Sequence, residues 1–265
     1  MKVVLFCGGL GTRLREFTGE IPKPMVKIGY RPIMWHLMKY YAHYGHKDFV
    51  LCLGYKADVI KQFFLQYEEW VSNDFTLSKG GKLLTLENND IEDWNITFVD
   101  TGLHANSGER LMAVRKYVED DEIFLANYSD GLTDLDLSVM IDEFRATDKV
   151  ASFLAVPPSQ SFHLVDIDAE GHVASLRPVA ESNLLINGGF FALRQEMFDF
   201  MRPGEDLVLE PFARLIEERR LLAYRYEHFW CMDTFKEQQQ LTDLYTSGSA
   251  PWEVWKHVAA DHVRS

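Results

Sequence analysis

Short apolar runs alternate with amphipathic segments along the first half of this chain. Val3–Cys7 is a continuous apolar run, which is typical of a strand covered on both faces. Similar runs follow at Phe49–Leu53, Ile96–Val99 and Ile123–Ala126. The spacing of apolar residues predicts helices between them, over Ile33–Tyr44, Ala57–Val71, Glu109–Val118 and Leu137–Thr147. Strands that alternate with helices in this way indicate an α/β fold of three layers around a parallel sheet.

The second half is richer in strands. The pattern predicts a hairpin around the turn "AEG", and the segment "LSKGGKLLTLENNDIEDW", residues 77–94, is expected to be irregular. The predicted strands of this half are Ala151–Val156, Leu164–Ile167, Val173–Leu176, Phe190–Leu193 and Ala223–Tyr226. No internal repeat or Pro/Ser-rich linker interrupts the chain. We therefore expect one domain over residues 1–265, with an α/β core over 1–150 that merges into a mixed region over 151–265.

Composition narrows the class of protein. The 265 residues are 47% hydrophobic and carry a net charge of -13, which argues against a nucleic-acid-binding protein because such proteins need a basic face. No apolar run approaches the ~20 residues of a membrane span, and no signal peptide opens the sequence, so we expect a cytoplasmic protein. Cys7, Cys52 and Cys231 lie far apart in or beside apolar runs, which indicates buried thiols in a reducing compartment.

The stretch "GGLGTRLREFTGEIPKPM", residues 8–25, has the features of a phosphate-binding loop. Its glycines expose successive backbone N–H groups directly after the first strand. Arg13 adds a guanidinium fork, and Lys23 adds a point charge between two prolines. The dinucleotide motif is excluded because Leu14 stands where its third glycine belongs, and the Walker motif is excluded because no G-K-[ST] ends the run. A solvated surface loop is the alternative.

This loop resembles the G-G-x-G-T-R … P-K-P loop of the sugar-1-phosphate nucleotidyltransferases. The segments "YSDGLTDLD", "INGGFFAL", "FWCMDT" and "APWEVW" extend the resemblance over nearly the whole chain and are similar to the cytidylyltransferase branch, which acts on glucose 1-phosphate. The resemblance implies a Rossmann-like three-layer sandwich with a mixed, mainly parallel sheet. It also implies a reaction in which CTP and a phosphorylated acceptor give a CDP-linked product and pyrophosphate.

The resemblance also implies roles for individual residues. Asp130 and Asp233 would hold Mg²⁺, and neither has an adjacent cation in the sequence. Arg13 and Lys23 would be the catalytic cations that grip the triphosphate. The nucleotide site would comprise Gly8, Gly9, Gly11, Thr12, Arg13, Lys23 and Arg110, with a surface salt bridge as the alternative role for Arg110. Asn187 and Gly188 would meet the acceptor, with an Asx turn as the alternative role for Asn187. Residues 1–150 would then bind nucleotide and residues 151–265 the acceptor.

Three motifs depart from the family pattern. Ser129-Asp130-Gly131 stands where the family has G-D-G, and "FWCMDT" is one residue shorter than the usual run before M-D-T. The family's E-K-P, whose lysine meets the sugar phosphate, is replaced by Leu176-Arg177-Pro178. Arg177 would keep the positive charge at the acceptor site, but Leu176 removes a carboxylate. The alternatives are therefore another sugar phosphate, a non-sugar phosphate or phosphonate, or a non-catalytic regulatory homologue that only binds nucleotide. Family members are homo-oligomers, and the same is expected here.

Overall fold

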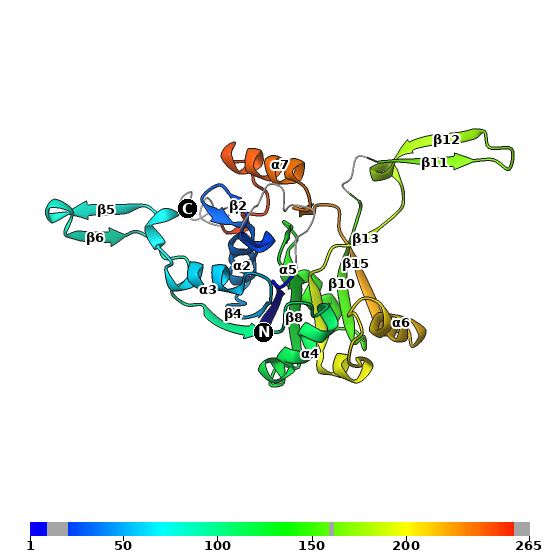
Figure 1. Ribbon diagram of the computed structural model, residues 1–265, viewed down its shortest axis with the longest axis horizontal. Coiled ribbons are helices and arrows are strands. Elements are labelled where there is room, and N and C mark those ends of the chain that lie inside the picture. Colours follow the sequence, from blue (N-terminus) through cyan, green and yellow to red (C-terminus); the bar gives the residue numbers. More distant parts are fainter. Residues whose placement is uncertain (10–20, 159–161, 257–265) are drawn as a thin grey trace.

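The computed structural model describes residues 1–9, 21–158 and 162–256. Its central sheet has eight strands (Figure 1). They are β1 (Lys2–Phe6), β4 (Asp48–Leu53), β7 (Asn95–Asp100), β8 (Ile123–Tyr128), β10 (Ala151–Val156), β13 (Ile186–Asn187), β14 (Phe191–Arg194) and β15 (Leu221–Arg225). Four two-stranded ladders lie outside this sheet. They pair β2 (Lys27–Ile28) with β3 (Arg31–Pro32), β5 (Phe75–Ser78) with β6 (Leu83–Leu86), β9 (Gly131–Leu132) with β16 (Trp230–Cys231), and β11 (His163–Ile167) with β12 (Val173–Pro178).

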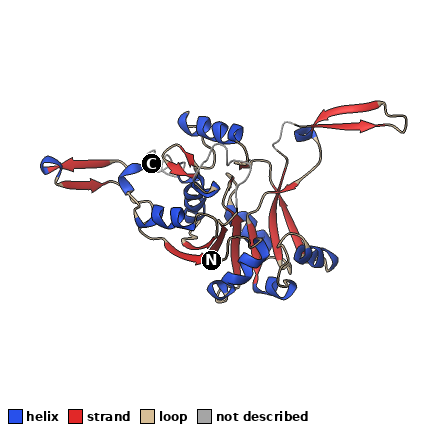
Figure 2. Ribbon diagram, viewed as in Figure 1, coloured by secondary structure: helices blue, strands red, loops and turns tan. Residues whose placement is uncertain are grey.

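Helices connect these strands (Figure 2). The α-helices are α2 (Ile33–His43), α3 (Ala57–Leu65), α4 (Ser107–Val118), α5 (Leu137–Arg145), α6 (Glu210–Glu217) and α7 (Phe235–Thr246). Short 3₁₀ turns form η2 (Lys23–Met25), η3 (Glu69–Val71), η4 (Lys79–Gly81), η5 (Val179–Glu181) and η6 (Gln195–Phe200). None of the helices among the described residues has the length and apolarity that a membrane crossing requires.

The sheet confirms the predicted fold class and its mixed character. Its strand order is β13-β10-β14-β8-β1-β4-β7, with β15 also paired to β10. β1 runs parallel to β4 and β8, and β4 runs parallel to β7, as the strand–helix alternation predicts. β14 enters antiparallel between β8 and β10, so strands from both halves of the chain form one sheet.

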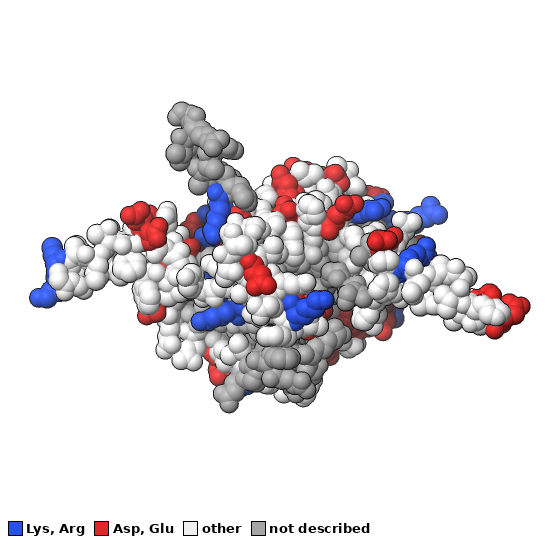
Figure 3. Space-filling view, turned by 90° about the horizontal axis from the view of Figure 1, so that it is seen from above, with Lys and Arg blue, Asp and Glu red and all other residues white. Residues whose placement is uncertain are grey.

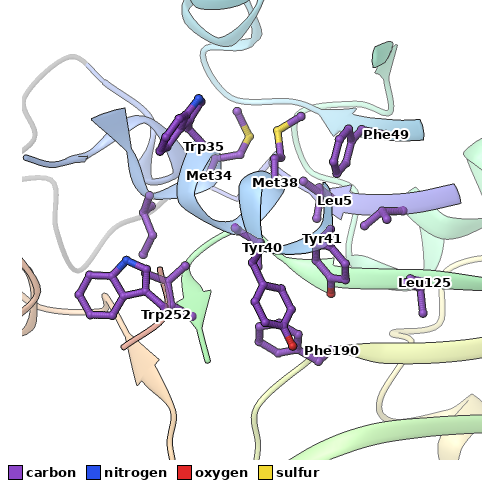
Figure 4. Close-up of a cluster of buried hydrophobic side chains, with 14 of the residues drawn as sticks. Leu5, Met34, Trp35, Met38, Tyr40, Tyr41, Phe49, Leu125, Phe190 and Trp252 are labelled. Atoms are coloured by element: carbon purple, nitrogen blue, oxygen red, sulfur yellow. The ribbon is translucent and has the colours of Figure 1, made fainter. Parts of the chain in front are cut away.

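Alternate residues of each strand pack against opposite helical layers. Leu5 on β1 and Leu125 on β8 face a cluster that contains α2, α5 and residues of α7. Their neighbours Val4 and Phe124 face a second cluster, formed with α4, η6 and α6. Figure 4 shows the first cluster, in which Met38, Tyr40 and Tyr41 of α2 lie against the strands and Phe190. Because both faces of the sheet are buried, these strands carry apolar residues on both faces, and the sequence shows continuous apolar runs.

Two sequence predictions about this region are wrong. The helix expected over Ala57–Val71 ends at Leu65. In the segment beyond it, the hydroxyls of Tyr67 and Ser72 donate hydrogen bonds to the buried carboxylate of Asp90. The segment that follows is not irregular but forms the β5–β6 hairpin. That hairpin and the β11–β12 hairpin project from opposite ends of the molecule (Figure 1).

The predicted burial of the cysteines is confirmed for two of the three. All three cysteines lie among the described residues and none forms a disulfide; Cys7 and Cys52 are buried, whereas Cys231 is only half-buried because it lies on a short outer ladder. Trp252 of the tail is fully buried and packs edge-on against Trp230.

Candidate active site

Arg110 of α4 binds the backbone of the glycine turn that follows β1, which begins at Gly8. The Arg110 guanidinium donates hydrogen bonds to the backbone oxygens of Gly8 (3.0 Å), Leu53 (3.1 Å) and Gly102 (3.0 Å), and to the hydroxyl of Thr101 (2.7 Å). A Cβ on Gly8 would lie 2.1 Å from Arg110 Nη1, so a larger residue here would displace the guanidinium from these hydrogen bonds. Arg110 is 4% exposed, and it donates to three backbone oxygens and one side-chain hydroxyl rather than to a carboxylate. A surface salt bridge is therefore the wrong interpretation of this residue.

A cavity of about 290 Å³ opens beside this turn. The glycine turn follows β1, and β8 and β4 lie on opposite sides of that strand, so the order of the parallel strands reverses here. Ligands of open α/β sheets bind at such reversal points, beyond the carboxyl ends of the strands. The lining includes Gly9, Lys23, Arg110, Tyr128 and Asp130. The predicted loop residues Gly11, Thr12 and Arg13 lie outside the described residues.

Asp130 and Asp233 meet because a short ladder joins their segments. Asp130 lies two residues after Tyr128, the last residue of β8, at the carboxyl edge of the sheet. β9 and β16 pair antiparallel with Gly131 opposite Cys231, and the backbone N–H of Met232 donates to the Asp130 carbonyl at 3.0 Å. This ladder places two aspartates that are far apart in the sequence on the same side of the site.

The start of α7 fixes the Asp233 backbone. Thr234 is the N-cap of α7 and forms a capping box with Glu237. The Glu237 carboxylate also accepts a hydrogen bond from the backbone N–H of Asp233, with 2.7 Å between nitrogen and oxygen. The turn that carries Asp233 is thereby tied to the first turn of the helix.

The Lys23 ammonium lies between the two carboxylates. Its Nζ contacts Asp130 Oδ2, and it donates to Asp233 Oδ1 at 2.5 Å. Burial by itself lowers the pKa of Lys23, but the two carboxylates outweigh burial and raise that pKa above its usual value. A cation is therefore held where both carboxylates converge, although the sequence places none beside either aspartate.

Ser129 replaces the first glycine of the family's G-D-G motif and links two strands of the sheet. Its side chain is buried, and its hydroxyl donates to the Phe6 carbonyl of β1 at 2.9 Å. This hydrogen bond links the ends of β1 and β8, so the serine fixes the distance between the glycine turn and Asp130.

A second cavity, of about 160 Å³, lies on the other side of Asp130. Asp130 and Asp233 form part of its lining, together with Asn187 and Gly188. Asp130 thus borders both cavities. The structure brings the predicted metal residues and two predicted acceptor residues together around one small space.

The turn that carries Asn187 is organised by Asn127, which the sequence analysis missed. Asn127 is 1% exposed, and its side-chain oxygen accepts the backbone N–H of Phe190 at 2.9 Å. Phe190 has a left-handed φ of 52°, which is strained for an aromatic residue, and Asn127 helps hold it. Asn187 itself accepts the Gly189 N–H at 2.8 Å, so the Asx turn is present and coexists with exposure to the cavity. A polar residue inside the apolar run of β8 was the available signal.

The structure places Arg177 elsewhere. Arg177 lies on β12 of the projecting hairpin, is exposed, and has its Nη2 3.8 Å from Asp166 Oδ2. It is not among the described residues that line either cavity. Its neighbour Leu176 is 64% exposed on the same hairpin, so it forms no apolar wall beside Asp130 in this structure.

Comparison with protein families matches residues 2–234 to the nucleotidyl transferase family. The chain belongs to this family. A glucose-1-phosphate cytidylyltransferase from Salmonella typhi is 41% identical over 259 residues, which cover 97% of this chain and 100% of that protein. A mannose-1-phosphate guanyltransferase from Candida albicans is more distant, at 26% identity over 87% of this chain and 60% of that protein.

Solved structures of other nucleotidyl transferases share the fold. A UDP-glucose pyrophosphorylase complexed with UDP-glucose has a TM-score of 0.67 over 93% of this chain and 98% of that one, at 14% identity. HddC from Yersinia pseudotuberculosis has a TM-score of 0.62 at 21% identity, over 92% of this chain and 99% of that one. These likenesses confirm the Rossmann-like architecture of this nucleotidyl transferase.

Proposed function

We propose that this nucleotidyl transferase joins CTP to glucose 1-phosphate, giving CDP-glucose and pyrophosphate. The observation that carries the chemistry is the meeting of Lys23, Asp130 and Asp233 at the boundary of two cavities. The choice of CTP and of glucose 1-phosphate follows from the full-length relative at 41% identity. The retained lysine and both aspartates argue against a regulatory homologue without catalytic function.

The reaction needs positioning more than proton transfer. A phosphate oxygen of the acceptor attacks the α-phosphorus of the nucleotide, a bond to the bridging oxygen breaks, and pyrophosphate leaves. The acceptor phosphate is already mostly dianionic near pH 7, because its second pKa is about 6, so no general base is required. The enzyme must instead align two anions that repel each other and neutralise the leaving group.

The described residues divide this task between the two cavities. The nucleotide would lie in the larger cavity, where the N–H groups of the glycine turn and the Lys23 ammonium face phosphate oxygens. The acceptor would lie in the smaller cavity, where the Asn187 amide can donate to sugar hydroxyls and Gly188 allows a close approach. In-line attack would then take place beside Asp130, which borders both spaces. Residues 1–150 supply most of the nucleotide side, and residues 151–265 the acceptor side.

The two aspartates fit a divalent cation. Oxygen atoms from both carboxylates already converge on the Lys23 ammonium, and Mg²⁺ favours one or two carboxylates together with substrate phosphates. We propose Mg²⁺ as the metal, with Asp130 and Asp233 as its protein ligands. When bound, such a metal would neutralise charge on the triphosphate. Lys23 must leave the carboxylates to make room, and the arriving triphosphate gives it a new anionic partner.

Other features of the proposal rest on the relatives and on the sequence. We propose that the enzyme acts in the cytoplasm and that it is a homo-oligomer, as its resemblance to the family implies. Arg177 remains a candidate for the acceptor phosphate only if the hairpin that carries it moves or reaches another copy. Within one chain, no described contact favours an acceptor other than glucose 1-phosphate.

The test is a pyrophosphate-release assay with Mg²⁺, in which CTP, UTP, GTP, ATP and dTTP are each combined with glucose 1-phosphate, mannose 1-phosphate and a simple alkyl phosphonate. We expect CTP with glucose 1-phosphate to give the highest kcat/KM, within the usual enzyme range of about 10⁴ M⁻¹s⁻¹ or above. Higher efficiency with the phosphonate would reassign the acceptor. Absence of pyrophosphate release from every pair would reject the catalytic proposal.

A further inference from the structure

Two hairpin arms project from opposite ends of the molecule (Figures 1 and 2). The basic arm comprises β5, η4 and β6, residues 75–86, and the acidic arm comprises β11 and β12 with their connecting turn, residues 163–178. Each is a separate two-stranded sheet, and no third strand among the described residues pairs with it. An isolated two-stranded hairpin is only marginally stable in water, so a further contact is expected to support each arm.

The basic arm has one apolar face. Directly opposed residues of an antiparallel pair lie on the same face, and the pairs Phe75–Leu86 and Leu77–Leu84 alternate with the pair Thr76–Thr85. Four large apolar side chains therefore share one face. Leu77 is 59% exposed, and Phe75 and Leu84 are each 42% exposed, so the chain itself leaves this face uncovered.

The acidic arm repeats this arrangement. Val165 pairs with Leu176, and Ile167 pairs with Val173 beyond a bulge, so these four residues share a face. They are 49%, 64%, 65% and 64% exposed, respectively. Exposed apolar faces of this kind mark interaction sites more often than free surface.

The two arms carry opposite charge. Residues 75–86 contain Lys79 and Lys82 and no acidic residue, whereas the acidic arm carries Asp166, Asp168 and Glu170 against a single arginine. Figure 3 shows basic side chains (blue) at the tip of one end of the molecule and acidic side chains (red) at the tip of the other. Two arms of the same kind would repel at their tips, but a basic arm and an acidic arm attract.

We propose that the basic arm of one copy of this chain docks on the acidic arm of a second copy. The two apolar faces pack on each other as a small sheet-on-sheet contact, and the lysines of one turn meet the carboxylates of the other. Because the arms differ and lie at opposite ends, the contact is head-to-tail, and every copy offers both halves of it. Such an interface closes into a ring or continues as a chain of copies. The inference is independent of the catalytic chemistry.

Charge reversal tests the pairing. Lys79→Glu with Lys82→Glu makes both arms acidic, and Asp168→Lys with Glu170→Lys makes both arms basic. In sedimentation velocity, we expect wild type to be oligomeric, each variant alone to dissociate at least tenfold more readily, and an equal mixture of the two variants to reassociate. Circular dichroism checks that both variants are folded. Lys61→Glu with Lys116→Glu changes the net charge equally at exposed positions away from the arms and should keep the wild-type mass.

A cross-link identifies the contact itself. Leu77→Cys protein mixed with Ile167→Cys protein should form a disulfide-linked dimer on mild oxidation, whereas either protein alone should give at most the background of wild type. Monomeric wild type, unchanged mass in both charge variants, or failure of their mixture to reassociate would each overturn the proposal. Equal cross-linking of Leu77→Cys protein with itself would show that like arms pair and would also overturn it.

Discussion

The carboxyl edge of the central sheet joins residues from distant parts of the chain, whereas each arm is built from neighbours in the sequence. Lys23 lies 107 positions from Asp130 and 210 from Asp233, yet all three side chains meet. In the arms, Leu77 faces Leu84 across one turn, and both stay exposed. The site is therefore organised by the packed core, while the arms fold locally and leave an apolar face for another molecule. Changes at one region should affect chemistry, and changes at the other should affect assembly.

The largest effect is expected at the paired aspartates. Asp130→Asn or Asp233→Asn removes a charge that faces the triphosphate and should lower kcat by on the order of a hundredfold or more, as when a transition-state stabiliser is lost. Steady-state kinetics with CTP and Mg²⁺ measures this change, and sedimentation should show an unaltered oligomer. Asp142→Asn, at an exposed position on α5, is the control. Wild-type kcat in Asp130→Asn protein would contradict the assignment.

Core and arm leucines should differ sharply in their contribution to stability. Leu125 of β8 is 1% exposed in the cluster that contains α2, so Leu125→Ala should lower the free energy of unfolding by about 2–5 kcal/mol. Leu77→Ala should change it by less than about 0.5 kcal/mol, because the side chain is exposed in the single chain. Urea unfolding at a concentration where the chain is monomeric gives both values. A large loss in Leu77→Ala protein would show that the arm packs on its own body.

Acid should destabilise the core through His36. Burial among Trp35, Trp252 and Tyr245 lowers the pKa of His36 to about 4 from its usual 6.5. Below pH 6.5 the unfolded chain takes up a proton that the folded chain refuses, so stability present above that pH is lost as pH falls toward 4. The loss is on the order of 3 kcal/mol for this residue.

The variant His36→Gln isolates this contribution. Urea unfolding at several pH values should give a shallower dependence on pH between 6.5 and 4 than in wild type. Part of the slope should persist, because burial also lowers the pKa of His46 to about 4. An identical slope in His36→Gln protein would reject the role of this residue.

The smallest effect concerns the competition between Lys23 and Mg²⁺ for the carboxylates of Asp130 and Asp233. In Lys23→Met protein the carboxylates lose their cation and repel each other, so Mg²⁺ alone should raise the melting temperature by a few degrees through mass action. Wild type should respond less to Mg²⁺ alone, because the ammonium competes for the same oxygens. Lys27→Met changes an exposed lysine of the same segment and should behave as wild type. Equal shifts in all three proteins would show that Lys23 and the metal do not compete.

The sequence by itself determined the fold class and the positions of the buried strands, because a strand covered on both faces must be apolar throughout. It also located Asp130 and Asp233 through resemblance to a family. It did not find the β5–β6 hairpin: Phe75, Leu77, Leu84 and Leu86 alternate with polar residues over strands too short for a clear pattern.

Only the tertiary structure decided which charges meet. The ammonium of Lys23 reaches both aspartates because the β9–β16 ladder brings two distant segments together, and no local pattern encodes that ladder. Arg110 was predicted at the nucleotide; it lines the larger of the two site cavities and also holds the Gly8 carbonyl, a contact that depends on the strands against which its helix packs. Arg177 was predicted at the acceptor and lies on an exposed arm. Apolar patterning is a property of neighbours in the chain, whereas ion pairs across a site depend on how the whole core is packed.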